Sequence, residues 1–144
     1  MMNRFQYPVK LAAAEEGGYI VPCRDLPELI TQGEEEQDAL SQAVDAMDEV
    51  FATYMIEGID FPEPSVAKRR EYLVAPPAET MAKAALYVAM REAGISKSQL
   101  AKRLGVDEKE VRRLLDPHYG SKLPRIAQAI NVLGQRLVIG LEPA

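Results

Sequence analysis

The chain opens with apolar residues that alternate with polar or small ones, at Phe5, Tyr7, Val9 and Leu11. A period of two predicts a half-buried strand over Phe5–Ala13. The glycines of "EEGG" predict a hairpin turn, and "YIVPC" after them predicts a second strand. Pro22 has no N–H to donate, so it marks an edge or a bulge. A short third strand is expected around Leu29–Thr31, ended by Gly33.

The period then changes to that of a helix. Apolar residues recur at spacings of three and four between Leu40 and Tyr54, which predicts one amphipathic helix over roughly Glu35–Glu57. "REYLVAP" predicts a closing strand further along. The predicted order is β-β-β-α-β, an α+β domain in which one helix covers a small sheet.

The C-terminal part is predicted to be all-α until its last residues. "MAKAALYVAM" predicts an apolar helix that ends at Gly94, and "PRIAQAINVLG" predicts a last amphipathic helix. "RLVIGLEP" then predicts a short strand without a partner strand in this region. We expect it to pair with a second copy in a homo-dimer or higher homo-oligomer, because its edge is otherwise exposed. The expected dimerisation residues are Leu137, Val138, Ile139 and Leu141.

Between these helices, "KSQLAKRLGVDEKEVRRLL" has the apolar spacing of a helix-turn-helix. Ala101 is small where the second helix must cross, and Gly105 permits a left-handed turn. Ser96 predicts the N-cap of the first helix. Asp107 and Glu110 form a D-x-x-E pattern that resembles a capping box for the second helix.

A helix-turn-helix places its second helix, here expected over Asp107–Leu115, in the major groove of double-stranded DNA. Its arginines can pair with guanine or hold phosphate. The start of the first helix should face the DNA backbone, and residues before the last helix can bind phosphate. The alternative is a helical hairpin used only for packing. The expected DNA-binding residues are Lys97, Ser98, Gln99, Glu108, Lys109, Arg112, Arg113, Ser121 and Lys122.

Charge divides the chain into two regions. Residues 1–75 hold 15 acids and 6 Lys/Arg, a net charge of −9, whereas residues 76–144 hold 7 acids and 11 Lys/Arg, a net charge of +4. This asymmetry predicts two domains with different partners, and Pro76 and Pro77 place their boundary between 75 and 76. No apolar run approaches the roughly 20 residues that span a bilayer. The lone Cys23 rules out an intrachain disulfide and is typical of a reducing cytoplasm.

The acidic stretch "GEEEQDALSQAVDAMDEVF" admits three interpretations: a metal-dependent active site, a solvated face, or a docking face for a basic partner. Two-metal nucleases need carboxylates that converge on ions about 4 Å apart, and acids strung along a helix do not converge. The lone His118 has no catalytic companion in a recognisable motif. We therefore expect no enzyme, no cofactor and no metal; docking and plain solvation both remain open. The expected contact residues are Glu34, Glu35, Glu36 and Asp38.

These segments resemble HicB-type antitoxins of the helix-turn-helix branch. "YPVKLAAAEEGGYIVPCRDLPELITQG" and the acidic helix resemble their N-terminal domain, and "ISKSQLAKRLGVDEKEVRRLLDPHYGSK" resembles the repressor-like domain of that branch. The resemblance implies a trimmed ribonuclease-H-like fold without that activity. It also implies neutralisation of HicA, a small basic ribonuclease toxin, and repression of the chain's own operon. The alternative is a stand-alone helix-turn-helix regulator whose N-terminal domain senses a small ligand.

Overall fold

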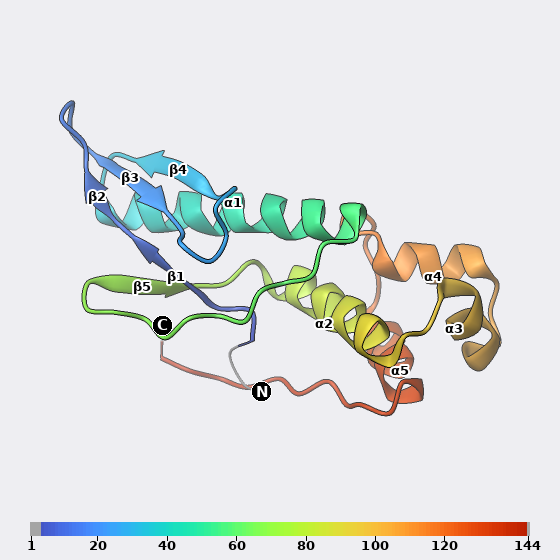
Figure 1. The fold of residues 1–144 in the computed structure, drawn as a ribbon. Helices are drawn as coiled ribbons and strands as arrows, with labels where there is room; N and C mark the ends of the chain where they lie inside the picture. The colour runs from blue at the N-terminus through green and yellow to red at the C-terminus, as the bar shows by residue number, and fades with distance from the viewer. Residues whose placement is uncertain (1–3, 144) are drawn as a thin grey trace. The chain divides into compact units, whose positions relative to one another are not determined.

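The computed structural model describes residues 4–143. The chain divides into two compact units, unit 1 over Met1–Met81 and unit 2 over Ala82–Ala144, and each is described by itself. The division falls inside helix α2 (Ala78–Ala93), whereas the sequence placed a boundary at the two prolines before that helix. Figure 1 shows the order of the elements along the chain.

Within its described residues, unit 1 contains two small antiparallel sheets. One pairs β1 with β5, and in the other β3 lies between β2 and β4. An isolated bridge between Val9 and Cys23 connects the two sheets. The strands are β1 (Tyr7–Lys10), β2 (Ala12–Ala13), β3 (Tyr19–Pro22), β4 (Ile30–Gly33) and β5 (Glu71–Val74).

The single strand expected over Phe5–Ala13 is thus two strands, which separate after Lys10. The separation has a cause in the neighbouring strand. The register that holds Val9 opposite Cys23 places Lys10 opposite Pro22, which has no N–H to donate to either neighbour. Pro22 therefore does not mark a sheet edge, because β3 is the middle strand of its sheet, but it does end that strand.

Helix α1 (Glu36–Glu57) covers one face of this layer and forms the core of unit 1 with it (Figure 1). Most of the predicted apolar stripe is buried, whereas Leu40 and Val44 are partly buried. The Phe51 ring packs on that of Phe61 at a centroid distance of 4.6 Å. Strand β4 and helix α1 approach each other closely at Gly33, where a Cβ atom would lie 2.4 Å from the Cα of Ala39. Only glycine permits this approach without a backbone shift.

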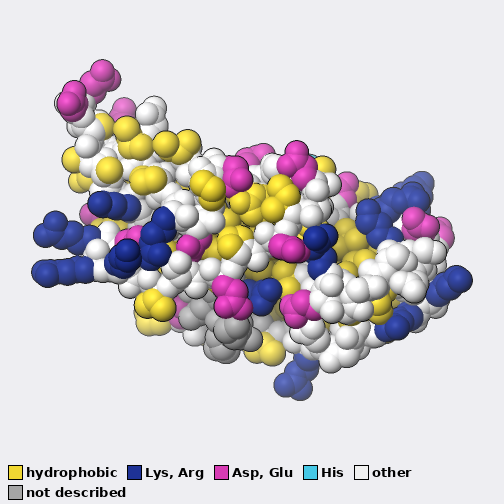
Figure 2. Space-filling model, viewed as in Figure 1, with side chains coloured by type: hydrophobic (Ala, Val, Ile, Leu, Met, Phe, Trp, Pro, Cys, Tyr) yellow, Lys and Arg dark blue, Asp and Glu magenta, His cyan; other side chains and the backbone are white. Residues whose placement is uncertain are grey.

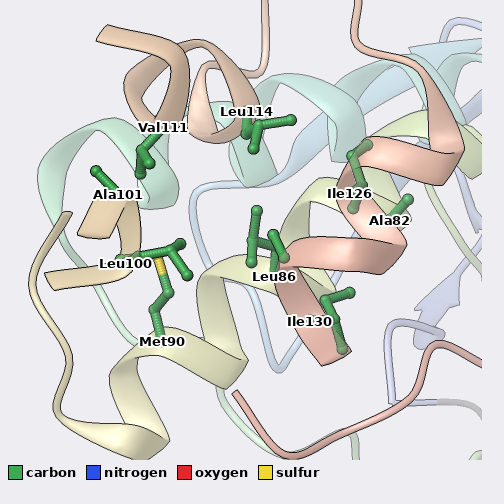
Figure 3. Packing of buried hydrophobic residues seen from close by; sticks show 10 residues of the cluster. Ala82, Leu86, Met90, Leu100, Ala101, Val111, Leu114, Ile126 and Ile130 are labelled. Carbon is green, nitrogen blue, oxygen red and sulfur yellow. The ribbon is translucent and has the colours of Figure 1, made fainter. Parts of the chain in front are cut away.

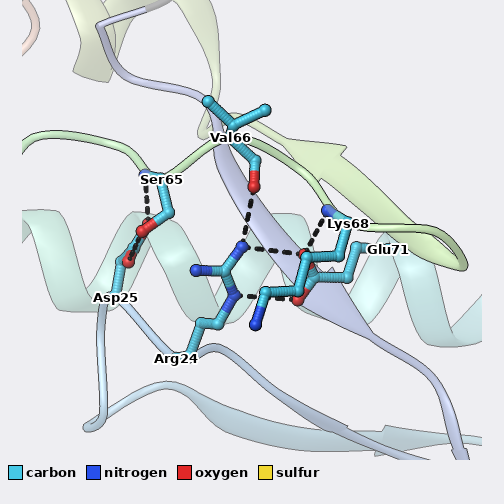
Figure 4. A network of polar contacts seen from close by, with 6 residues as sticks. All are labelled: Arg24, Asp25, Ser65, Val66, Lys68 and Glu71. Carbon is cyan, nitrogen blue, oxygen red and sulfur yellow. Dashed lines mark hydrogen bonds and ion pairs between the residues drawn. The ribbon is translucent and has the colours of Figure 1, made fainter.

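A polar network on the surface of unit 1 fixes the long segment between α1 and β5 (Figure 4). The Arg24 guanidinium donates to both carboxylate oxygens of Glu71, at 2.9 and 3.0 Å, and to the carbonyl of Val66 at 2.8 Å. Asp25 accepts from the backbone N–H and the hydroxyl of Ser65, at 2.7 and 2.6 Å. The hydrogen bonds from Arg24 lower the pKa of Glu71 to about 2. The end of β3 is thereby joined to the segment that enters β5.

Unit 2 is helical, and one apolar core joins its helices (Figure 3). Its elements are α2, α3 (Lys97–Leu104), α4 (Glu108–Leu115) and α5 (Leu123–Val132). The largest buried core side chains are those of Leu86, Met90, Leu100, Val111, Leu114, Ile126 and Ile130. The helices expected in the C-terminal part are all present.

The tail after α5 forms neither a helix nor a strand up to residue 143. The strand expected over Leu137–Leu141 is therefore absent from the single chain, where the described part of unit 2 supplies no strand to pair with it. Leu137 packs against the core of unit 2, but Val138 and Ile139 are 64% and 72% exposed. A strand at this position would need a partner from a second chain.

Candidate DNA-binding and protein-docking surfaces

Helices α3 and α4 both begin at a side-chain cap, as predicted. Ser96 accepts from the N–H of Gln99 at 3.1 Å, and the Gln99 side chain accepts from the N–H of Ser96 at 2.9 Å, which completes a capping box. Asp107 accepts from the N–H of Glu110 at 2.9 Å. The Glu110 carboxylate instead pairs with Arg125 of α5 at 3.2 Å, so the capping box expected at α4 is half formed.

The turn between α3 and α4 is set by Gly105. Its φ of 70° lies in the left-handed region, as predicted, and its N–H donates to the carbonyl of Ala101. Beyond the turn, Val111 and Leu114 of α4 are buried with Leu100 of α3 in the core of unit 2. This packing fixes which face of α4 turns outward.

The outward face of α4 carries charged side chains. Glu108, Lys109 and Arg112 are exposed, whereas Val111 and Leu114 are buried. The Arg112 guanidinium pairs with the Glu108 carboxylate at 3.1 Å, one turn earlier in the helix. Exposed ion pairs of this kind contribute little to stability, so Arg112 can leave Glu108 and bind another partner at little cost.

Arg113 is placed differently from Arg112. It is half-buried, and its guanidinium carbon lies 5.4 Å from the centre of the Tyr119 ring, in the loop that follows α4. This stacking directs Arg113 toward the loop. The two adjacent arginines therefore differ in access to a ligand on the outward face of α4.

The remaining expected DNA-binding residues fall into two groups. Lys97 and Ser98 are exposed at the start of α3, and Lys122 is exposed at the start of α5. The side chain of Gln99, by contrast, is engaged in the capping box. Ser121 is half-buried, and its hydroxyl accepts a hydrogen bond from Lys83 at 3.0 Å. The lysines of the expected set are thus exposed, whereas two of the uncharged side chains, those of Gln99 and Ser121, already make hydrogen bonds within unit 2.

The acidic residues expected to contact a basic partner are all exposed at the start of α1. Asp38 accepts from the N–H of Glu34 at 2.9 Å and so joins the residue before the N-cap to the first turn of the helix. Glu36 accepts from the Tyr72 hydroxyl of β5 at 2.6 Å. Glu35 occupies the N-cap position, where its side chain makes no capping hydrogen bond. Part of this acidic surface therefore has a structural role within unit 1.

Sequence reasoning overlooked a basic turn beside these acids. Lys68, Arg69 and Arg70 are exposed where the chain enters β5, and dark blue atoms gather at that end of unit 1 in Figure 2. Arg70 has a φ of 69°, a conformation that a non-glycine residue rarely adopts. Because Tyr72 bonds to Glu36 just beyond this turn, the surface is one of mixed charge. The signal was the "KRR" run in the sequence.

An apolar area lies on the sheet face that α1 leaves uncovered. Ile20 is 42% exposed and Ile30 is 68% exposed, and Ile30 stands opposite the exposed Pro22 in the register of β3 with β4. Figure 2 shows hydrophobic side chains gathered over β2, β3 and β4. Exposed apolar residues that lie together are typical of protein contacts.

Other kinds of site have less support in the part of the chain that the structure describes. No group of three or more His, Cys, Asp or Glu side chains there is placed to hold a metal ion. Among the described helices, none combines the length and the apolar character that crossing a membrane requires. Cys23 is buried, and burial raises the pKa of its thiol, which disfavours the reactive thiolate.

Similarity to known proteins covers nearly the whole chain. Residues 6–85 match the family described as HicB-like antitoxin of bacterial toxin–antitoxin systems. Antitoxin HicB of Escherichia coli (strain K12) is 33% identical over 132 residues, which cover 92% of this chain and 96% of that protein. Antitoxin HicB 1 of Photorhabdus laumondii is 30% identical over 99% of this chain and 90% of its own length. Antitoxin HicB of Pseudomonas fluorescens (strain Pf0-1) is 31% identical over 97% of this chain and 96% of its own length. The family that the sequence resembled is confirmed: the chain belongs to the HicB-like antitoxins of bacterial toxin–antitoxin systems.

Proposed function

We propose that the chain neutralises a small basic HicA-type ribonuclease through unit 1 and represses its own operon by binding operator DNA through α3 and α4. The observation that carries the proposal is that the family match and the capped helix pair lie in different parts of the chain. The antitoxin family match ends at residue 85, and the capped helix pair with exposed Lys109 and Arg112 lies beyond it. Family membership favours this function over a stand-alone regulator that senses a small ligand.

Neutralisation requires that the antitoxin compete with RNA for a basic surface of the toxin. The exposed carboxylates of Glu34 and Glu35 suit this role, because acidic groups attract a basic partner and speed its encounter. Charge of this kind acts mainly on the association rate. The apolar face around Ile20 and Ile30 suits the second role, which is to slow dissociation once the partner is bound.

These two roles predict separable kinetic effects. Reversal of Glu34 and Glu35 to lysine should lower the association rate with the toxin, with a smaller effect at high salt. Ile30→Asn, by contrast, adds no charge, so it should raise the dissociation rate and leave the salt dependence unchanged. Surface plasmon resonance with the purified toxin measures both rates. If Ile30→Asn leaves the complex lifetime unchanged, the sheet face is not part of the contact.

The neutralising activity is tested directly with a purified HicA-type toxin. The two proteins should co-purify, and RNA cleavage by the toxin should stop when the antitoxin is present at equal or greater concentration. Cleavage that continues at saturating antitoxin would contradict the first half of the proposal, whatever the DNA experiments give.

Repression is proposed to use two copies of unit 2 on a palindromic operator, with half-sites roughly one helical turn or a multiple of it apart. We propose that the exposed tail residues Val138, Ile139 and Leu141 pair the two copies. Deletion of residues 136–144 should then give a monomer in analytical sedimentation and weaken operator binding. A deletion variant that remains dimeric would assign the contact to another surface.

A further inference from the structure

One ionised side chain of unit 2 lies inside the protein rather than on its surface. Lys83, on α2, is 1% exposed. Its Nζ atom donates to the carbonyl of Arg113 at 3.0 Å, to the carbonyl of Asp116 at 2.7 Å and to the hydroxyl of Ser121 at 3.0 Å. A buried ammonium group is costly unless such acceptors surround it, so this site depends on all its members.

The acceptors of Lys83 come from the two ends of a single loop. Arg113 lies in the last turn of α4 and Asp116 is its C-cap, so their carbonyls belong to the negative end of that helix. Ser121 lies two residues before α5. Lys83 therefore ties α2 to the end of α4 and to the loop that leads into α5.

Aromatic stacking supports the same loop from a second direction. The Tyr119 ring lies 6.0 Å from the Nζ atom of Lys83 and 5.4 Å from the guanidinium of Arg113. Within the loop, Asp116 accepts from the N–H of Tyr119 at 3.1 Å, and its carboxylate accepts from the N–H of His118 at 2.9 Å. The loop is thus held in one conformation around the buried ammonium group.

We propose that Lys83 is a positioning residue for operator binding, an inference that rests on the proposed DNA-binding function. Its buried charge fixes the end of α4 and the loop, and so fixes where Arg112 and Lys122 present their charges. Lys83 itself touches no DNA, because its side chain is enclosed. An apolar side chain of similar length would fill the same space in the core but would leave the carbonyls and the hydroxyl without their donor.

Two substitutions in the full-length chain isolate this role. Lys83→Met removes the charge and keeps the length of the side chain. Ser121→Ala removes one acceptor and leaves the ammonium group bonded to both carbonyls; it also removes the 3.4 Å hydrogen bond that the Ser121 hydroxyl donates to the carbonyl of Arg113. Lys10→Met, an exposed position on β1, removes the same charge and serves as the control. Affinity for the operator and for a scrambled duplex is measured by fluorescence anisotropy, at a temperature where circular dichroism shows every variant folded. Amide hydrogen exchange of residues 116–122 is measured without DNA.

The folded Lys83→Met protein should bind its operator about tenfold more weakly and lose part of its preference for operator over scrambled DNA. The reason is that the end of α4 and the loop would no longer hold Arg112 and Lys122 in one position. Ser121→Ala should show a smaller loss in the same direction, and Lys10→Met should bind like the wild type. Exchange at Tyr119 should be faster in both unit 2 variants. A residue needed only for stability would lower the unfolding temperature and leave both the affinity and the preference of the folded protein unchanged.

Wild-type affinity and preference in folded Lys83→Met would overturn the inference while leaving the proposed repression intact. If Lys83→Met does not fold, Ser121→Ala decides together with the amide exchange of residues 116–122. Because Ser121 is itself an expected DNA contact, weaker operator binding supports the inference only if exchange in the loop is also faster. Unchanged operator binding, or weaker binding with unchanged exchange, overturns the inference. Failure of the wild-type chain to bind any duplex from its own promoter would instead overturn the DNA-binding function on which the inference rests.

Discussion

Units 1 and 2 both carry ion pairs at the surface, but they differ in where the charge lies that holds a distant segment in place. In unit 1 the paired charges lie at the surface, where Arg24 and Glu71 hold a long segment against the sheet. In unit 2 a buried charge, Lys83, holds the end of one helix and the loop after it. A surface pair tolerates exchange with solvent and with partners, whereas a buried charge requires fixed acceptors. We infer that unit 1 attracts a partner through the charge on its surface, whereas unit 2 holds its contact residues in a fixed arrangement.

The largest expected effect tests whether the two units are independent in stability. Gly33→Ala places a Cβ atom 2.4 Å from the Cα of Ala39, so β4 or α1 must shift. We expect a cost of about 1–3 kcal/mol in the unfolding free energy of unit 1, with the unfolding of unit 2 unchanged. Chemical denaturation followed by amide exchange resolves the two units. Gly120→Ala, whose Cβ would meet open space, is the control. Equal destabilisation of both units would contradict their independence.

A second prediction concerns the geometry of unit 2. Arg112→Ala should cost about 1–3 kcal/mol in operator binding and relax the preference at one base pair, as expected for a lost bidentate base contact. Arg113→Ala should weaken binding to all sequences more evenly, because Arg113 stacks on Tyr119 and supports the loop. Anisotropy titrations on operator and scrambled duplexes across a salt series separate the two patterns. A double variant that binds like the wild type would show that α4 is not the reading helix.

The electrostatic field of unit 1 is tested by reversing charge at two places, one at the start of α1 and one further along it. Lysine at positions 34, 35 and 36 should slow association with a basic toxin by about tenfold at low salt. Lysine at the exposed positions 45, 49 and 57, which changes the net charge equally, should slow it less. Stopped-flow mixing at several salt concentrations measures the rates. Equal slowing by both variants would mean that net charge alone matters. Because Glu36 also accepts from Tyr72, Glu36→Gln is needed to separate charge from structure.

The smallest expected effect is the pH dependence of the surface pair. The pKa of Glu71 is about 2 in the folded chain against an ordinary value of 4.5, mainly because Arg24 donates to its carboxylate. A depressed pKa adds stability that is present above pH 4.5 and is lost as the pH falls toward about 2. Glu71→Gln should remove this part of the pH dependence of unit 1. Thermal unfolding across the acid range provides the measurement, with the exposed Glu63→Gln as the control.

What the sequence predicted well depends on contacts between near neighbours. The caps at Ser96 and Asp107 and the left-handed turn at Gly105 involve residues at most a few positions apart, so their signals are complete in a short segment. The extent of α1 followed from the spacing of its apolar residues in the same way. Such features are decided locally and need no knowledge of the fold.

What the sequence left open depends on contacts between distant residues. The pair of Arg24 with Glu71 spans 47 positions, and the hydrogen bond of Lys83 with Ser121 spans 38. The sequence does contain one signal of the Lys83 site, because Lys83 is the one charged residue in the apolar run from Thr80 to Met90. The expected tail strand failed for a related reason: an apolar pattern specifies a tendency to pair, but the partner must come from elsewhere.

The hydrogen bond from Tyr72 to Glu36 gives unit 1 a built-in spectroscopic probe. The chain has no tryptophan and 6 tyrosines, so its near-ultraviolet absorption and emission come chiefly from tyrosine. The bond to Glu36 raises the pKa of the Tyr72 phenol above its ordinary value, which delays its ionisation in an alkaline titration. A ligand that engages the carboxylate of Glu36 would release this phenol and change its spectrum. Occupation of the acidic start of α1 should therefore change the tyrosine spectrum of the unlabelled protein, and this change should be lost in Tyr72→Phe.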